Sequence, residues 1–258
     1  IVKVQKRSIK PDVVTITSTN SNKDFENCKS MRVPYDLVVS GEEQYVYLVT
    51  NKEEIAVLHK LQKWNKTLPK LGLRMKTGLT VDFRNKDMLR NEEEKGAIPL
   101  FYSQHIKQGE VLFPIQKEKQ YIVTERKGLM QENRNYLFVK RFTAKEEPRR
   151  LQCGVYLAKR FPQYKNISTQ NKINFIDGVL TEMSECVVYG LYVLFNSTIY
   201  DEYYRILNGS TQVNSTEINA MPVPELDIIQ EMGRNIMESK DFSEKNCNLI
   251  LEECCGET

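Results

Sequence analysis

The hydrophobic pattern of this chain changes its period near residue 181, and that change limits the folds open to it. Before this point, short runs rich in β-branched and aromatic residues alternate with polar or glycine-containing turns, which predicts short strands. These expected strands are residues 79–83, 98–102, 111–115, 121–124, 136–142 and 153–157. Beyond it, apolar residues recur at helical spacing, so we expect a buried helix at residues 187–195 and amphipathic helices at 226–238 and 242–253.

Strands followed by helices, without alternation between the two, predict an α+β fold and exclude repeated βαβ units. We therefore expect a twisted antiparallel or mixed sheet followed by C-terminal helices. A smaller opening segment should hold strands at 1–6 and 13–18, a surface loop at 19–30 and a strand at 45–50. Asn51 is expected to cap a helix whose apolar face carries Ile55, Leu58, Leu61 and Trp64.

A polar loop between two expected helices is the next distinctive feature. The first helix should start after Asn196 or Ser197 and end at Asn208-Gly209, because both of these last residues tolerate positive φ. A shorter helix is expected from Ser215. The loop between them either presents amides and hydroxyls to a partner or is a well-capped connection without a ligand. Tyr200, Tyr203 and Tyr204 have helical spacing, which predicts core packing rather than base stacking.

Positive charge is concentrated in one part of the chain. Residues 126–172 carry twelve Lys or Arg and three Glu, whereas the net charge of the whole chain is only +3. Such a block is the pattern expected of a phosphate-binding surface, and a solvated charged face is the alternative. If about four to six cations reach phosphates, DNA binding should weaken with salt at a log–log slope of about −4 to −5.

Five stretches in order resemble the C-terminal part of adenine-specific DNA methyltransferases of restriction-modification systems. They are Thr77-Gly78-Leu79-Thr80-Val81-Asp82-Phe83-Arg84; Ile98-Pro99-Leu100 with Gln104-His105-Ile106; Leu137-Phe138-Val139-Lys140-Arg141-Phe142 with Arg149-Arg150-Leu151; Asn171-Lys172-Ile173-Asn174-Phe175-Ile176; and residues 194–224. In that family a catalytic domain comes first and a target-recognition domain follows. The resemblance implies that residues 1–67 are the end of the catalytic domain and its connector, that 68–224 are the recognition domain, and that 225–258 are C-terminal helices.

The resemblance also implies that the catalytic machinery lies elsewhere in the parent protein. The family's polar-Pro-Pro-aromatic loop has no match in this chain, which contains no Pro-Pro pair, and its glycine-rich donor turn has none either, since there is no Gly-x-Gly. We therefore expect no catalytic residue, metal or cofactor in this chain. The parent would use S-adenosylmethionine, and the partners would be double-stranded DNA and the missing catalytic domain. The absence of an initiator Met agrees with the expectation of a piece of a longer protein.

A recognition domain grips phosphates with cations and reads base edges with bidentate side chains. The candidate DNA-binding residues are Arg84, Gln104, His105, Lys107, Lys140, Arg141, Lys145, Arg149, Arg150, Gln170, Asn171, Asn208, Ser210, Thr211, Gln212 and Asn214. For three parts of this set a structural role stays open. His105 is as consistent with a histidine that forms hydrogen bonds in the core as with a DNA contact. Arg84 could form a structural ion pair. Arg149 and Arg150 could pair with Glu146 and Glu147 inside the protein.

Three other functions are compatible with these features. Glu125-Arg126-Lys127 has the acid-x-Lys form of metal-dependent nucleases, with Asp82 as a second carboxylate, although this pattern arises often by chance. A free-standing DNA specificity subunit would recruit a separate methylase. A protein-interaction module would use the basic face to bind an acidic partner.

Composition agrees with a cytoplasmic protein and not with a membrane protein. Hydrophobic residues make up 40% of the chain, and no apolar run approaches the roughly 20 residues that cross a bilayer. The six cysteines are scattered without a Cys-x-x-Cys pair, which indicates free thiols in a reducing compartment.

Overall fold

The computed structural model describes residues 11–19, 25–41 and 44–256 of the 258-residue chain. The chain divides into two compact units, Ile1–Lys60 and Leu61–Thr258. The described residues form mixed sheets together with seven α-helices, of which the last are C-terminal, and the predicted α+β class is confirmed. The roles expected for residues 1–67, 68–224 and 225–258 stay predictions.

The described part of the first unit contains two two-stranded antiparallel sheets, β1 with β2 and β3 with β4, and short helices. Its elements are β1 (Val13–Ser18), η1 (Phe25–Asn27), β2 (Lys29–Pro34), α1 (Tyr35–Val38), β3 (Val39–Ser40), β4 (Tyr45–Val46) and α2 (Lys52–Leu61). The predicted strand at 13–18 is confirmed, whereas the one at 1–6 lies outside the described residues. β1 pairs with β2 from Val13↔Pro34 to Ser18↔Lys29, so the segment expected to be all loop ends in a strand.

Helix α2 begins where the sequence predicts it. The Asn51 Oδ1 atom accepts a hydrogen bond of 2.8 Å from the backbone N–H of Glu54. This bond satisfies one of the amides that a helix start leaves without an intrahelical partner. The predicted N-cap is therefore confirmed.

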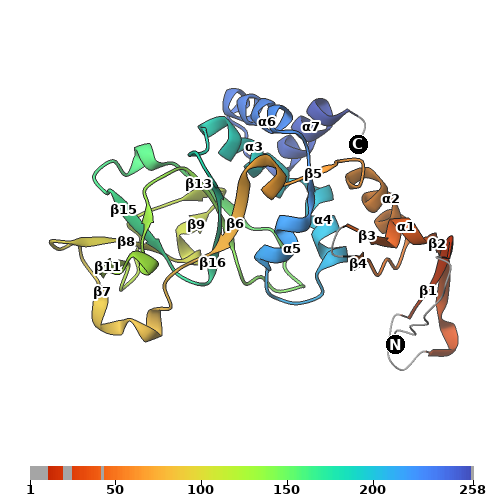
Figure 1. Cartoon of the computed structure of the whole chain (residues 1–258), viewed down its shortest axis with the longest axis horizontal. Helices are drawn as coiled ribbons and strands as arrows, with labels where there is room; N and C mark the ends of the chain where they lie inside the picture. Colours follow the sequence, from red (N-terminus) through yellow and green to blue (C-terminus); the bar gives the residue numbers. More distant parts are fainter. Residues whose placement is uncertain (1–10, 20–24, 42–43, 257–258) are drawn as a thin grey trace. The chain divides into compact units, whose positions relative to one another are not determined.

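The second unit is built on two sheets (Figure 1). The six-stranded sheet has the order β6 (Leu73–Thr77), β16 (Ile173–Gly178), β13 (Tyr136–Lys140), β14 (Cys153–Tyr156), β10 (Glu110–Val111) and β9 (Ile106–Lys107). The five-stranded sheet has the order β12 (Gln131–Glu132), β15 (Asn166–Thr169), β8 (Ala97–Phe101), β11 (Tyr121–Val123) and β7 (Leu89–Arg90). Most neighbours are antiparallel, but β10 with β14 and β15 with β8 are parallel, so both sheets are mixed.

The expected strand at residues 79–83 is wrong. Thr80 forms only an isolated parallel bridge with Gln170, and Asp82–Arg84 form the 3₁₀ turn η3. The strand in this region is β6, which ends earlier, at Thr77. The alternation of buried and exposed residues belongs to β6, where Leu73 and Met75 are buried and Arg74 and Lys76 are exposed.

The two sheets enclose an aromatic core. Phe101, Tyr136, Phe138, Tyr156 and Phe175 are each at most 2% exposed. The Phe101 ring makes edge contacts with the rings of Phe138 and Tyr156 at centroid distances of 5.6 and 5.2 Å. Aromatic side chains of this size bury large apolar areas and prefer such edge contacts. The core therefore fixes the ends of β8, β13 and β14 relative to one another.

The C-terminal part is helical from residue 185, as predicted. Its helices are α3 (Glu185–Asn196), α4 (Thr198–Leu207), α5 (Ser215–Ala220), α6 (Leu226–Ser239) and α7 (Glu244–Cys255), and β17 (Pro222–Val223) pairs with β5 (Lys66–Thr67). Helix α3 packs on β13 and β14, and α6 and α7 pack on α3. Tyr200, Tyr203 and Tyr204 of α4 are at most 1% exposed, which confirms the predicted core packing.

Helix α4 ends at the predicted place by a different mechanism. Asn208 follows its last residue, but with φ of −119° it lies in the extended region rather than at positive φ. The backbone N–H of Asn208 still donates to the carbonyl of Tyr204 at 2.8 Å.

Within the described residues, no helix is both long and apolar enough to span a membrane.

Candidate nucleic-acid interface

Three strands of the six-stranded sheet bring their connecting loops to one end. β6 and β13 both run antiparallel to β16, with Thr77 opposite Asn174 and Lys140 opposite Ile173. The C-terminal ends of β6 and β13 therefore meet the N-terminal end of β16 (Figure 1). The loops that leave β6, leave β13 and enter β16 emerge together.

Backbone hydrogen bonds join these loops to the polar loop after α4. Asn171 N–H donates to Thr80 O at 2.8 Å, and Arg141 N–H donates to Lys172 O at 2.9 Å. Val213 N–H donates to Arg141 O at 2.7 Å, and Thr143 N–H to Thr211 O at 3.1 Å. We call the four joined segments, residues 80–84, 141–145, 170–172 and 210–213, the loop edge. Residues 141–145 of the basic block and residues 210–213 of the amide-rich loop are about 70 residues apart in sequence, yet they share one surface.

The exposed side chains of the loop edge are mostly cationic or aromatic. Arg84, Lys145 and Lys172 are exposed, and Arg141 is partly buried. Asp82 is the one acidic residue in the four segments. Phe83 and Phe142 are 64% and 50% exposed. Cations with flat apolar rings between them are the groups that bind phosphates and bases.

The loop after α4 is held by its own side chains. Asn208 is 5% exposed, and its Oδ1 atom accepts from the backbone N–H of Ser210 at 2.7 Å. Asn214 Oδ1 caps α5 by accepting from Thr216 N–H at 3.0 Å. These two amides therefore brace the loop and do not face a partner. Ser210 and Thr211 are exposed and Gln212 is half-buried, so these candidate residues remain accessible to solvent.

Arg150 has a structural position, and its expected phosphate contact needs correction. Its side chain is 1% exposed, its Nε–H donates to Thr143 Oγ1 at 3.1 Å, and Nη2–H donates to Ser210 O at 2.6 Å. Its backbone N–H donates to Asp201 Oδ1 at 2.8 Å. Because it is buried, this guanidinium cannot reach a phosphate. It ties the basic block to the 210–213 segment.

Arg149 is also engaged within the protein. Its Nη2–H groups donate to the carbonyls of Phe195 at 2.8 Å and Ser197 at 3.1 Å, where α3 ends. Its Nη1 atom lies 2.9 Å from a carboxylate oxygen of Glu244. A cation at a helix C-terminus satisfies the last carbonyls and the helix dipole. Arg149 thus pairs with α7 rather than with Glu146 or Glu147.

Glu147 instead braces the turn inside the basic block. Its Oε1 atom accepts from Ala144 N–H at 2.7 Å, and Oε2 accepts from the Gln152 side chain. The bond from the Ala144 amide holds the pKa of Glu147 below its usual value. The carboxylate therefore shapes the loop that carries Lys145.

His105 and Gln170 lie in the core. His105 is 0% exposed, and its Nδ1 atom accepts from Tyr102 N–H at 2.9 Å. Burial lowers the pKa of His105 to about 4, so the ring is neutral. Gln170 is 1% exposed and its Oε1 atom accepts from Lys172 N–H at 2.8 Å. The structure favours the core alternative for His105, and it gives Gln170 the role of shaping the turn before β16.

The other candidate residues lie at or near the surface. Arg84 lies over the Phe83 ring, 5.5 Å from guanidinium carbon to ring centroid, and not in the ion pair considered from sequence. Lys140 donates to Gln152 Oε1 at 2.8 Å. Gln104 and Lys107 are exposed on η5 (Ser103–His105) and β9, outside the four segments. Sequence reasoning missed Lys172, Phe83 and Phe142, although an aromatic residue next to Arg at a strand end is a signal that would have found the last two.

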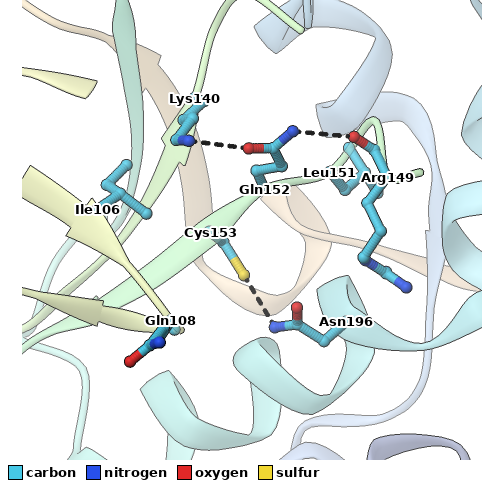
Figure 2. Close-up of a pocket in the computed structure, with 9 residues that line it drawn as sticks. Ile106, Gln108, Lys140, Arg149, Leu151, Gln152, Cys153 and Asn196 are labelled. Atoms are coloured by element: carbon cyan, nitrogen blue, oxygen red, sulfur yellow. Dashed lines mark hydrogen bonds between the residues drawn. The ribbon is translucent and has the colours of Figure 1, made fainter. Parts of the chain in front are cut away.

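A small hollow lies behind the basic block (Figure 2). Its volume is about 180 Å³, and Lys140, Gln152, Cys153 and Asn196 are among its lining residues. Asn196 Nδ2–H donates to Cys153 Sγ at 3.2 Å, and burial raises the pKa of that thiol to about 12. Gln152 Nε2–H donates to Arg149 O at 3.1 Å. These bonds hold residues 149–153 against β13 and α3, so the hollow is part of how the block is folded.

The nuclease alternative gains no support from the geometry. Within the described ranges, no group of three or more His, Cys, Asp or Glu side chains gathers in a way that could hold a metal ion. Asp82 lies on η3, and its Oδ1 atom accepts from Phe83 N–H at 2.9 Å. All six cysteines are free thiols.

Two proteins of known class are similar to this chain over nearly its whole length. It is 32% identical over 250 residues to the type II methyltransferase M.PstI of Providencia stuartii, and 32% identical over 247 residues to the type II methyltransferase M.BsuBI of Bacillus subtilis. Each match covers 93% of this chain and 48% of the relative. The chain spans about half the length of these relatives. It is therefore related to type II restriction-modification methyltransferases over about half of their length.

Other comparisons add little. No family model matches the chain. A solved chain from a type I R-M system is 11% identical, with 80% of this chain and 52% of that chain covered and a TM-score of 0.29. The HsdS subunit from Thermoanaerobacter tengcongensis is 9% identical, with coverage of 80% and 50% and a TM-score of 0.29. TM-scores this low carry no weight for fold or function.

Proposed function

We propose that this chain is the target-recognition region of an adenine-specific type II DNA methyltransferase, and that the loop edge binds double-stranded DNA. One observation carries the proposal: backbone hydrogen bonds join the basic block to the 210–213 segment. They run from Val213 N–H to Arg141 O and from Thr143 N–H to Thr211 O. These bonds create one cationic surface from distant parts of the sequence. The relation to type II methyltransferases supports the choice of DNA as the partner.

Phosphate binding belongs to the cations that the fold leaves exposed. Lys145, Lys172 and Arg84 lie on three different segments of the loop edge and are exposed. Arg141 donates through Nη1 to Asn171 O at 3.0 Å, which aims its side chain along the edge. Base reading belongs to Thr211, Gln212 and Asn171, since Thr, Gln and Asn side chains form hydrogen bonds to the base edges that a groove exposes.

The parent protein would supply what this chain lacks. Its other half would bind S-adenosylmethionine, flip the target adenine out of the duplex and transfer the methyl group. This chain would fix the DNA sequence and orientation. Alone, it should give no incorporation of labelled methyl groups into DNA, and measurable incorporation would contradict this division of roles.

Binding to duplex DNA is tested by fluorescence anisotropy across a range of salt concentrations. With about four edge cations on phosphates, we expect a log–log slope of about −3 to −4. This is shallower than the sequence alone suggested, because Arg149 and Arg150 are engaged inside the protein. Heparin should compete and an acidic protein should not, which separates DNA recognition from a protein-interaction module.

Two charge variants locate the surface. Lys172→Gln should weaken binding and reduce the slope by about 1, because one phosphate contact is lost. Lys159→Gln is the matched control: Lys159 is exposed beyond the opposite end of β14, where it pairs with Glu185 at 2.6 Å. Equal effects of the two changes, or no DNA binding by the unaltered chain, would overturn the proposal.

A further inference from the structure

Two phenylalanines on the loop edge face solvent. Phe83 is 64% exposed and Phe142 is 50% exposed, whereas Phe101 and Phe138 of the core are 0% exposed. Burial of a Phe side chain stabilises a folded protein, and these two positions forgo much of that stabilisation. A single exposed apolar residue is ordinary. Two on adjoining segments of one cationic surface indicate a shared partner.

The backbone beneath each ring is braced. Phe142 lies opposite Gln212 in an antiparallel bridge, and the N–H groups of its neighbours, Arg141 and Thr143, are both bonded. Phe83 N–H donates to Asp82 Oδ1 at 2.9 Å, and Arg84 N–H donates to Val81 O at 3.1 Å. Rings carried on a fixed backbone lose little conformational entropy when they bind.

Each ring has an arginine over one of its faces. The guanidinium carbon of Arg84 lies 5.5 Å from the centroid of Phe83, and that of Arg141 lies 5.6 Å from the centroid of Phe142. These distances are within the range of cation–π attraction. Each pair offers a flat apolar face with a positive charge at its side.

The two segments adjoin through a single residue. Asn171 N–H donates to Thr80 O, and Asn171 O accepts from the Arg141 side chain. The two Phe–Arg pairs therefore lie on either side of the turn at Asn171.

Resting on the proposed function, we propose that Phe83 and Phe142 are apolar wedges that enter the minor groove and partly unstack base pairs of the bound duplex. Arg84 and Arg141 would contact the phosphates that border the groove at those steps. Phenylalanine is among the residues that open base steps in this way. Stacked bases flanked by phosphates complement a ring with a cation beside it. An acidic protein surface offers the charge without the flat faces.

The test uses the whole 258-residue chain and a duplex enriched by it from a randomised library. 2-Aminopurine placed at successive positions of that duplex should brighten at one or more steps on binding, because unstacking relieves its quenching. The Phe83→Ala/Phe142→Ala double variant should bind about tenfold to a hundredfold more weakly and should lose the brightening. The salt slope should not change, since no phosphate contact is removed.

Two further variants separate a wedge from a general loss of structure. The double leucine variant, Phe83→Leu/Phe142→Leu, should retain most of the brightening, because leucine also serves as a wedge. Leu180→Ala is the matched control: Leu180 is 91% exposed beyond the opposite end of β16, and its removal should leave binding unchanged.

The outcomes distinguish this inference from the proposed function. If the unaltered chain binds DNA with the expected salt slope but no position brightens, the wedge is wrong and DNA recognition stands. If the double alanine variant binds as tightly as the unaltered chain, the wedge is also wrong. If the unaltered chain does not bind duplex DNA, both proposals fail.

Discussion

At the scale of single residues, the structure separates cations that hold the fold from cations that face solvent. Sequence alone grouped Arg149 and Arg150 with Lys145 and Lys172, since all four lie in one basic block. Burial and bonding divide them: Arg150 is 1% exposed and donates to Ser210 O, whereas Lys172 is exposed. No local sequence pattern carries this distinction, because the partners of Arg150 lie up to 60 residues away.

Arg150→Met should destabilise the protein by about 2–4 kcal/mol. The change removes the bond to Ser210 O and leaves the buried Thr143 Oγ1 atom without its donor, and an unsatisfied buried acceptor costs its desolvation energy. Urea unfolding measures the loss. Lys145→Met, an exposed change in the same block, should stay within about 0.5 kcal/mol. Equal midpoints for the two variants would contradict the structural role of Arg150.

His105 should make stability depend on pH. Burial holds its pKa at about 4 in the folded state, against an ordinary value of 6.5. Between these values the unfolded chain binds more protons than the folded one, so the free energy of unfolding falls as pH is lowered from 6.5 towards 4. The loss attributable to this residue is up to roughly 3 kcal/mol.

Urea unfolding at a series of pH values, for the unaltered chain and for His105→Gln, checks this expectation. The variant should be less stable at neutral pH, because Tyr102 N–H loses its acceptor. It should also lose less stability on acidification than the unaltered chain. Parallel pH curves for the two proteins would show that His105 is not buried in its neutral form.

At the scale of elements, the sequence predicted helices better than strands. The expected helix from residue 226 is α6 (Leu226–Ser239), and the short helix from Ser215 is α5. The capping residue and the apolar period of a helix both lie within a few residues of it in the sequence. At the start of α3, for example, the Ser184 hydroxyl oxygen accepts from Val187 N–H. Two-residue strands such as β9 and β12 are defined by their pairing with another strand, β10 and β15 respectively. They are too short to show an alternating hydrophobic pattern in the sequence.

The strand β16 shows the same limit more clearly. All six of its residues are buried, yet Asn174 and Asp177 break its apolar pattern. Each makes a bond to a distant segment: Asn174 Nδ2–H donates to Val213 O at 2.8 Å, and Asp177 Oδ2 pairs with Lys76 Nζ at 2.8 Å. The hydrophobic pattern did not predict a strand here, and the stretch was singled out only by its resemblance to a family motif.

Gly190→Ala and Gly233→Ala should each destabilise the crossing of α3 and α6 by at least about 2 kcal/mol. A Cβ atom at Gly190 would lie 1.7 Å from the Ile229 carbonyl oxygen, and one at Gly233 would lie 1.8 Å from the Cys186 carbonyl oxygen. Both obstacles are backbone, so the helices themselves must move apart. Thermal unfolding measures the loss.

Gly209→Ala is the matched control for this pair. An added Cβ there meets nothing within 4 Å, and Gly209 is not among the glycines with positive φ. Its substitution should therefore change stability by at most about 0.5 kcal/mol. If all three variants unfold at the same temperature, the helices are not packed as closely as the structure has them.

At the scale of the whole molecule, the sequence predicted the fold class and the identity of the two interacting regions, but not their arrangement. The count of charges pointed to the basic block, and the polar stretch between two expected helices pointed to the loop. The bonds that join them, such as Val213 N–H to Arg141 O, depend on a chain path through α3 and α4 that no local pattern contains. The exposed rings of Phe83 and Phe142 escaped notice for a related reason, because hydrophobic residues in a sequence are taken as core until a surface is known.

The most direct test of the central claim is lysine footprinting of the chain with and without duplex DNA. Acetylation, read by mass spectrometry, reports the access of reagent to each lysine. We predict that DNA protects Lys145 and Lys172 of the loop edge and leaves Lys159, beyond the far end of β14, unchanged. Equal protection of all three, or protection of Lys159 alone, would contradict the placement of DNA on the loop edge.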